Sequence, residues 1–171
     1  MAQKRIVIVG TTYPFRGGLA TFNERLAREL MAEGHEVIIY TLSLQYPNFL
    51  FPGTTQMSEE AAPEGLDIRI KVNSVNPFNW MKIGKELRKM APDLVLMKFW
   101  IPFIGPSLGT IARQARKNGK TRVISIVDNM IPHEKRVGDM KLIRYFARSV
   151  DAFVAMSRSV EQDIHSFNTG K

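Results

Sequence analysis

The sequence predicts an α/β fold, a doubly wound and mostly parallel Rossmann-like sheet with helices on both faces. Strand and helix patterns alternate along all 171 residues. The first strand, residues 6–9, is a run of consecutive apolar residues, which is typical of strands buried on both faces of a parallel sheet. Because repeated strand–helix–strand units need right-handed crossovers, we expect the strand order 3-2-1-4-5-6.

Each element follows from local signals. After the first strand, Leu19, Phe22, Leu26 and Leu30 recur at the spacing of one helix face. Further strands are expected at residues 36–41, 66–72, 94–99, 122–127 and 151–155, and further helices at residues 80–90, 104–118, 140–148 and 157–167. Ser157 is the expected N-cap of the last helix, and residues 42–65 form a long loop rich in Pro, Gly and Ser.

Residues 10–18 link the first strand to the first helix and end on Gly17 and Gly18. A helix that begins at the carboxyl end of a central strand presents unpaired N–H groups and the positive end of its dipole, and phosphates bind there. The missing Cβ atoms of the two glycines would let a ligand approach the backbone. The alternative is that the pair only shapes the helix start. The loop is too long for the compact NAD-binding turn, which disfavours NAD.

Polar and titratable residues follow the fifth strand, where a doubly wound sheet places its ligands. Asp128 and Asn129 could hydrogen-bond sugar hydroxyls, and His133 could act as a general base or bind phosphate. The alternative is that Asp128 caps a turn while His133 and Glu134 begin an exposed helix. We favour a ligand role for the group.

The loops after the second and fourth strands supply further candidates. Trp100 could stack on a sugar or pack under a loop, and Lys98, at the end of an apolar strand, is costly to bury without a partner. We expect Lys98 to point into the crevice or to form an ion pair there. Residues 44–52 are apolar for a loop and could contact a lipid or form a lid.

Composition limits the class of protein. The chain has a net charge of +8 and no cysteine, which favours anionic partners and excludes disulfides, thiolate zinc sites and a cysteine nucleophile. No window approaches the roughly 18 apolar residues of a membrane span, and the amino terminus does not resemble a secretory signal. We expect a cytoplasmic, single-domain unit over residues 1–171 that uses no metal or other cofactor.

Four segments together resemble the N-terminal domain of GT-B glycosyltransferases of family four, the retaining "group 1" class. Gly17-Gly18, the following helix and Gly34-His35-Glu36-Val37 match the order P-x-x-GG, helix, G-H-x-V. Residues 126–134 resemble the HNxxPHE segment of bacterial members, and residues 154–160 are similar to their strand-plus-Ser segment. The resemblance covers nearly the whole chain.

The resemblance implies a two-lobed enzyme that moves a sugar from a nucleotide-sugar to a saccharide or lipid-linked acceptor. Gly17 and Gly18 would then approach the donor diphosphate, and a catalytic role is expected for Asp128, Asn129 and His133. The residues expected to contact the acceptor are Arg16, Lys98, Trp100 and Glu134. Such enzymes act in cell-surface polysaccharide biosynthesis, in the cytoplasm or peripherally at the inner face of the membrane.

The chain departs from the family pattern in two ways. The first His of HNxxPHE is replaced by Asp128, and no Glu-x7-Glu donor domain is present. We therefore expect an N-terminal half that transfers no sugar efficiently alone. The alternatives are a non-catalytic glycosyltransferase-like partner and a basic module for anions or nucleic acid. The leading hypothesis includes no nucleic-acid partner, because aromatic residues are not interleaved with the basic ones.

Overall fold

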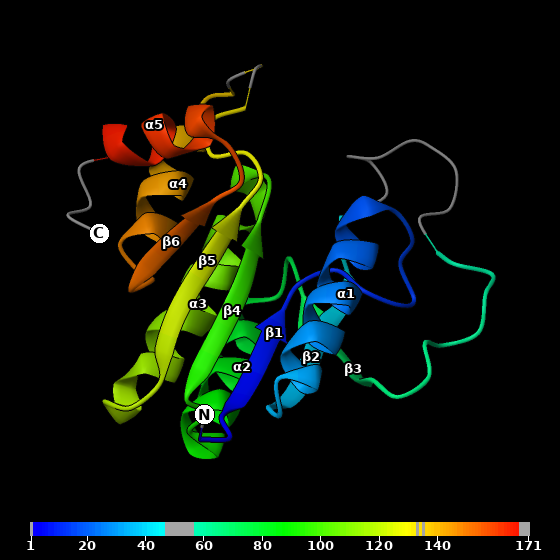
Figure 1. The fold of residues 1–171 in the computed structure, drawn as a ribbon. Helices are drawn as coiled ribbons and strands as arrows, with labels where there is room; N and C mark the ends of the chain where they lie inside the picture. Colours follow the sequence, from blue (N-terminus) through cyan, green and yellow to red (C-terminus); the bar gives the residue numbers. More distant parts are fainter. Residues whose placement is uncertain (1, 47–56, 133, 135, 168–171) are drawn as a thin grey trace.

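The computed structural model describes residues 2–46, 57–132, 134 and 136–167. Six strands form one sheet in the order β3-β2-β1-β4-β5-β6, and all neighbouring pairs are parallel (Figure 1). The strands are β1 (Arg5–Val9), β2 (Glu36–Leu44), β3 (Asp67–Asn73), β4 (Leu94–Phe99), β5 (Arg122–Val127) and β6 (Ala152–Ala155). The predicted fold class and strand order are confirmed.

The helices are α1 (Gly18–Ala32), α2 (Pro77–Met90), α3 (Gly105–Ala115), α4 (Asp139–Ala147) and α5 (Arg158–Ser166), with short 3-10 turns η2 (Pro102–Ile104) and η3 (Arg116–Asn118). Helix α2 begins three residues before the predicted start, because the Asn76 side chain accepts hydrogen bonds from the backbone N–H groups of Phe78 and Asn79. Ser157 caps α5 as predicted, accepting from the N–H of Val160.

The two faces of the sheet are covered unequally. Helices α2, α3 and α4 pack on one face and build the larger core, which includes Leu87, Ile111 and Phe146. Helix α1 packs on the other face through a smaller cluster that includes Ile8 and Ala27, and Figure 1 shows it in front of β1 and β2. Helices therefore lie on both faces, but a single long helix serves the second one in the described residues.

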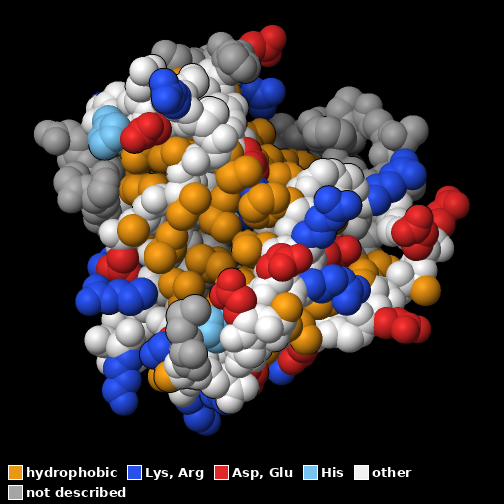
Figure 2. All heavy atoms as spheres, in the orientation of Figure 1, with side chains coloured by type: hydrophobic (Ala, Val, Ile, Leu, Met, Phe, Trp, Pro, Cys, Tyr) orange, Lys and Arg blue, Asp and Glu red, His pale blue; other side chains and the backbone are white. Residues whose placement is uncertain are grey.

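The part of that second face beyond α1 presents apolar side chains to solvent. Val154 and Met156, on β6 and just after it, are each 48% exposed, and Ile124 on β5 is half-buried. Figure 2 shows hydrophobic side chains across the middle of this face. Parallel sheets are ordinarily covered on both faces, and exposed apolar areas are typical of interfaces.

None of the helices in the described ranges has the length and apolar composition needed to cross a bilayer.

Candidate functional site

The start of α1 lies open at the carboxyl edge of the sheet. Gly17 is the N-cap residue, with φ 107° and ψ 179°, and no side chain caps the helix. A Cβ atom built on Gly17 or Gly18 would meet nothing within 4 Å, so neither glycine is needed for packing. The first helical hydrogen bond runs from the N–H of Thr21 to the oxygen of Gly17. The preceding N–H groups are left for a ligand or water.

A groove of about 430 Å³ adjoins this helix start. One wall comes from residues 13–24, including Arg16, and the other from residues 58–63, including Glu59 and Glu60. The walls are joined by a hydrogen bond from the N–H of Ser58 to the oxygen of Pro14, 2.7 Å long. Arg16 can pair with a phosphate, whereas the carboxylates can accept hydrogen bonds from sugar hydroxyls. The lining therefore suits a ligand that carries both groups.

Beneath this edge, Asn23 fixes the loop after β1. Its Nδ2 atom donates to the oxygen of Thr11 over 2.8 Å, and its side chain is buried. Gly10 makes this approach possible, since an added Cβ there would lie 2.7 Å from Asn23 Nδ2 and 3.0 Å from Lys98 Cβ. Asn23 was absent from the predicted site. Its signal in the sequence is a polar residue between Ala20 and Ala27, on the inward face of the helix.

Lys98 and Asp128 form an ion pair where β4 and β5 end. Lys98 Nζ lies 2.8 Å from Asp128 Oδ1, and the side chains are 2% and 31% exposed. The ammonium also lies 3.6 Å from the ring centroid of Phe22 on α1. Of the two arrangements expected for Lys98, the ion pair is present. The Oδ2 atom of Asp128 and the Oδ1 atom of Asn23 are buried and accept no hydrogen bond from the described residues. Such acceptors are rare in folded proteins.

Trp100 turns toward a different cluster. It is half-buried against the larger core, and its Nε1 donates to the hydroxyl of Tyr46. The Tyr46 ring in turn lies 6.1 Å from that of Phe103. These contacts match the packing alternative for Trp100, and sugar stacking by Trp100 stays a prediction.

The structure brings some of the predicted site residues together. Asn129 follows Asp128 and is half-buried, and Glu134 is exposed. His133 lies outside the described residues, as do residues 47–52 of the apolar loop. Gly17, Gly18 and Arg16 lie together at the start of α1. Lys98 and Asp128 pair where β4 and β5 end, and the Lys98 ammonium contacts Phe22 of α1.

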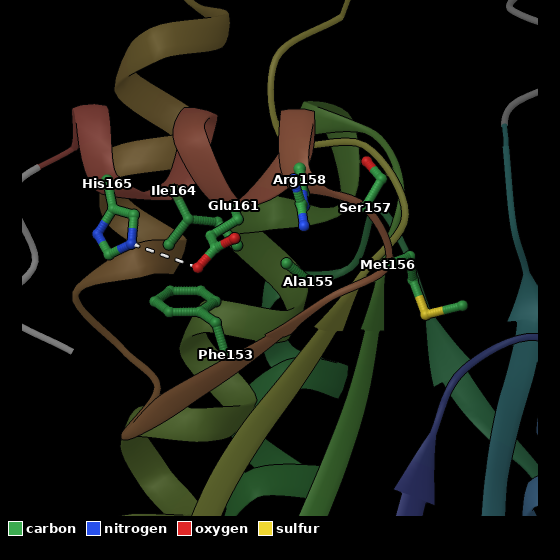
Figure 3. Close-up of a pocket in the computed structure, with 8 residues that line it drawn as sticks. All are labelled: Phe153, Ala155, Met156, Ser157, Arg158, Glu161, Ile164 and His165. Atoms are coloured by element: carbon green, nitrogen blue, oxygen red, sulfur yellow. Dashed lines mark ion pairs between the residues drawn. The ribbon is translucent and has the colours of Figure 1, made fainter.

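A second hollow, of about 520 Å³, lies between β6 and α5. Figure 3 shows Phe153, Ala155 and Ile164 beneath the helix, with Glu161 directed toward His165 at a distance of 3.9 Å. The residues from Met156 to Arg158 border it. Its charged groups are exposed, and the buried part of its lining is apolar, so it lacks the buried polar atoms found beside α1.

The marked pKa shifts among the described groups occur away from this edge. Burial raises the pKa of Tyr40 well above its ordinary value, and the hydrogen bond to Glu86 adds to the effect. Burial alone would raise the pKa of Glu86, but hydrogen bonds from Lys71 and Tyr40 outweigh it and lower that pKa. On the surface, the backbone N–H of Arg5 and the ammonium of Lys4 lower the pKa of Asp93. These groups stabilise β2, β3 and the start of β1.

The described residues contain no cluster of three or more His, Cys, Asp or Glu side chains that could hold a metal ion.

Comparison with known proteins identifies the family and the fold. The family model described as Glycosyltransferase Family 4 matches residues 16–170. No curated protein sequence matches. An alpha-glucosyltransferase solved with UDP and a 13-mer DNA containing a HMU base is 12% identical over 97% of this chain and 40% of its own, with a TM-score of 0.60. A putative UDP-N-acetylglucosamine 2-epimerase from Listeria monocytogenes is 11% identical over 98% and 43%, with a TM-score of 0.61. At such identities the likeness is one of fold. The chain spans about two fifths of these structures' length.

Proposed function

The chain belongs to glycosyltransferase family 4, and we propose that it is the acceptor-side, N-terminal lobe of an enzyme that transfers a sugar from a nucleotide-sugar. The observation that carries the proposal is the start of α1. Its glycines are open, its first N–H groups are uncapped, and the groove beside it offers both a cation and carboxylates. A diphosphate and a sugar meet those two needs together.

In the proposed reaction, a bond forms between an acceptor hydroxyl oxygen and the anomeric carbon as the bond from that carbon to the diphosphate breaks, and the hydroxyl proton passes to the departing diphosphate. The N–H groups after Gly17 and Gly18 would meet the negative charge that develops on the leaving diphosphate. In the retaining mode of the family, attack and departure occur on the same face of the sugar. No metal or cofactor takes part in the proposed step.

Asp128 is the group best placed to accept a hydrogen bond from the acceptor hydroxyl. Its Oδ1 atom is engaged by Lys98, whereas its buried Oδ2 atom accepts nothing from the described residues and could take a hydroxyl hydrogen bond. We assign Asn129 and His133 to the same reacting centre, with Arg16, Trp100 and Glu134 as acceptor contacts. Lys98 would serve through Asp128, because its own ammonium is buried.

A second lobe would supply the donor nucleotide site. Two observations support this part of the proposal. The chain spans about two fifths of the length of the neighbouring structures. Apolar side chains on β5 and β6 are exposed, and a further element could cover them. The acceptor class proposed is a saccharide or a lipid-linked sugar, as in cell-surface polysaccharide synthesis at the inner face of a membrane.

The test is nucleotide release by a polypeptide that carries both lobes, measured across a panel of nucleotide-sugars. Gly18→Val is expected to lower kcat/KM by at least about a hundredfold, the scale of losing an anion-stabilising site, while thermal stability stays unchanged. Arg25→Val is the matched control, because it places the same side chain on the exposed surface of α1, away from the site. Equal turnover by both variants would show that the start of α1 takes no part in the reaction.

The same assay distinguishes an active transferase from a non-catalytic, glycosyltransferase-like partner. A folded two-lobed polypeptide that releases no nucleotide from any donor, alone or with saccharide acceptors, would be a glycosyltransferase-like partner. Asp128→His, which restores the family residue, is then the informative variant, because renewed turnover would identify the substitution as the cause.

A further inference from the structure

A shallow hollow lies at the amino edge of the sheet, where α3 ends and β5 and β6 begin. It measures about 340 Å³, and we call it the amino-edge hollow; its lining includes Arg113, Arg116, Lys117, Gly119, Arg122 and Asp151. Four of the lining residues are cations and one is an acid. Figure 2 shows Lys and Arg side chains along the lower left of the molecule, in the part where Figure 1 places the end of α3. The hollow therefore favours an anion.

Two of the four cations, Arg113 and Arg116, are held in place through Ser149. Ser149 is fully buried, and its hydroxyl accepts a hydrogen bond from Arg113 Nε over 2.9 Å. The backbone oxygen of the same residue accepts from Arg116 Nη1 over 3.1 Å. The Arg113 guanidinium also lies 4.2 Å from the ring centroid of Tyr145. Contacts with the protein therefore fix both guanidinium groups beside one hollow.

Asp151 neutralises only part of this charge. Its Oδ1 atom lies 2.6 Å from Arg116 Nη2 and 3.9 Å from Arg122 Nη1, and its Oδ2 atom accepts the N–H of Val123 over 2.8 Å. Both carboxylate oxygens are therefore engaged. The described residues engage one nitrogen of Arg113 and two of Arg116. Because each guanidinium carries five N–H groups, donors remain for a ligand or water.

The fixed guanidinium groups point to phosphate rather than to anions in general. The end of a helix attracts cations of any kind, and a lysine there acts as a point charge. A guanidinium held in one orientation offers parallel N–H donors that match the oxygens of a phosphate group. Lys117 and Arg122 are exposed beside the two held arginines, so they can approach a ligand once it is bound.

We propose that the amino-edge hollow binds a small, soluble diphosphate compound through Arg113 and Arg116. Each of its two phosphate groups can meet one guanidinium, and the exposed cations Lys117 and Arg122 neutralise the remaining charge. The hollow lies at the beginnings of β5 and β6 rather than at their carboxyl ends. Binding there leaves the groove beside α1 open and does not depend on the proposed transferase reaction.

The experiment is an NMR titration of the ¹⁵N-labelled 171-residue chain with pyrophosphate at constant ionic strength. We expect saturable shifts of the amide signals of Gly119 and Thr121, which line the hollow. The amides of Gly17 and Gly18 report on the groove beside α1 in the same spectra. A ligand at one hundred times its Kd should also raise Tm by roughly 5–10 °C for a domain of this size.

Two further probes define the ligand. Inorganic phosphate should bind at least about tenfold more weakly than pyrophosphate, because it loses the charge-assisted hydrogen bonds to one guanidinium. UDP distinguishes a free diphosphate from one joined to a nucleoside: tighter binding of UDP than of pyrophosphate would indicate contacts with the nucleoside as well.

Arg113→Lys is the informative variant, because it keeps the charge and removes the planar fork. We expect it to raise the Kd for pyrophosphate at least about tenfold, since an ammonium cannot make two parallel hydrogen bonds. Arg25→Lys is the matched control, because it makes the same replacement at an exposed position on α1. It should keep the Kd within about twofold of the parent, since charges away from the site are screened.

Three results would each overturn the proposal. The first is an absence of shifts at Gly119 and Thr121 in the folded chain. The second is an equal Kd in Arg113→Lys and in the control, which would show attraction by net charge alone. The third is confinement of the shifts to Gly17 and Gly18, which would assign the diphosphate to the groove beside α1. That last result would still support the proposed transferase site, so the two proposals fail separately.

Discussion

Adjacent substitutions at Gly17 and Gly18 give a sharp test of the helix start, because the structure predicts a clear loss of stability at Gly17 and almost none at Gly18. Gly17 has φ 107° and ψ 179°, a region that only glycine occupies readily, and a side chain there costs about 1–3 kcal/mol. Gly18 has no positive φ, and its added Cβ would meet no atom within 4 Å. Its replacement by alanine should change stability by less than about 0.5 kcal/mol.

The expected values translate into a clear difference in melting temperature. For a domain of this size, 1 kcal/mol corresponds to roughly 2–4 °C. Taking the middle of the strain range, about 2 kcal/mol, Gly17→Ala should lower Tm by about 4–8 °C and Gly18→Ala by less than about 2 °C. Differential scanning calorimetry and urea denaturation of the two variants measure this directly.

The result also separates folding from ligand binding at this site. Gly18→Ala should keep the fold yet weaken binding of a diphosphate ligand by the two-lobed polypeptide, because the methyl group occupies the space above the helix N–H groups. If both alanine variants lose the same stability, the backbone conformation assigned to Gly17 is wrong. If Gly18→Ala binds as the parent does, the glycines contact no ligand.

Three further substitutions test the packing and electrostatics around the site. Lys98→Met should destabilise the fold by about 2 kcal/mol in urea denaturation, less than the 3–5 kcal/mol typical of fully buried pairs because Asp128 is partly exposed. Adding Asp128→Asn should recover most of the loss, and a lack of recovery would mean that the two groups do not interact. Gly84→Ala should lower the free energy of unfolding by about 1 kcal/mol, because its Cβ would lie 2.5 Å from Gln114 Cβ. The cost of overpacking is expected to outweigh the gain in helix propensity. An increase in Tm would contradict the close approach of α2 and α3. Because its folded-state pKa is lowered, Asp93 contributes stability at pH values above its ordinary 3.8 that is lost as pH falls through the lowered pKa. Asp93→Asn should therefore flatten the acid limb of the stability curve, and an unchanged limb would refute the assignment.

Much of the site's scaffold could be predicted because its determinants are local. The apolar run of β1 and the helical spacing after Gly18 involve neighbours along the chain, and right-handed crossovers then restrict the strand order. The positions of Gly17, Asp128 and Lys98 at the carboxyl edge follow from that order. Helix starts were less accurate, as α2 shows, because the side chain of Asn76 moved the start to Pro77.

The partners of these residues could not be predicted. The role of Asn23 depends on Gly10 lying against it, and these two residues belong to different elements. Trp100 could equally have faced a ligand. Its contact with Tyr46 joins two loops that lie 54 residues apart in the sequence. Glu86 of α2 likewise turns inward to Tyr40, a residue of another element that lies far away along the chain.

By itself, the sequence determined the α/β class, the parallel strand order and the presence of glycines at the start of α1, because periodicity and turn chemistry act between near neighbours. Only the tertiary structure decided that Lys98 pairs with Asp128, that Val154 on β6 stays exposed, and that the lysines of α2 point outward. Those outcomes depend on strand register, which places Lys98 beside Ile126, and on which helix packs on which face. Such long-range geometry is set by burial of the whole core rather than by any single segment.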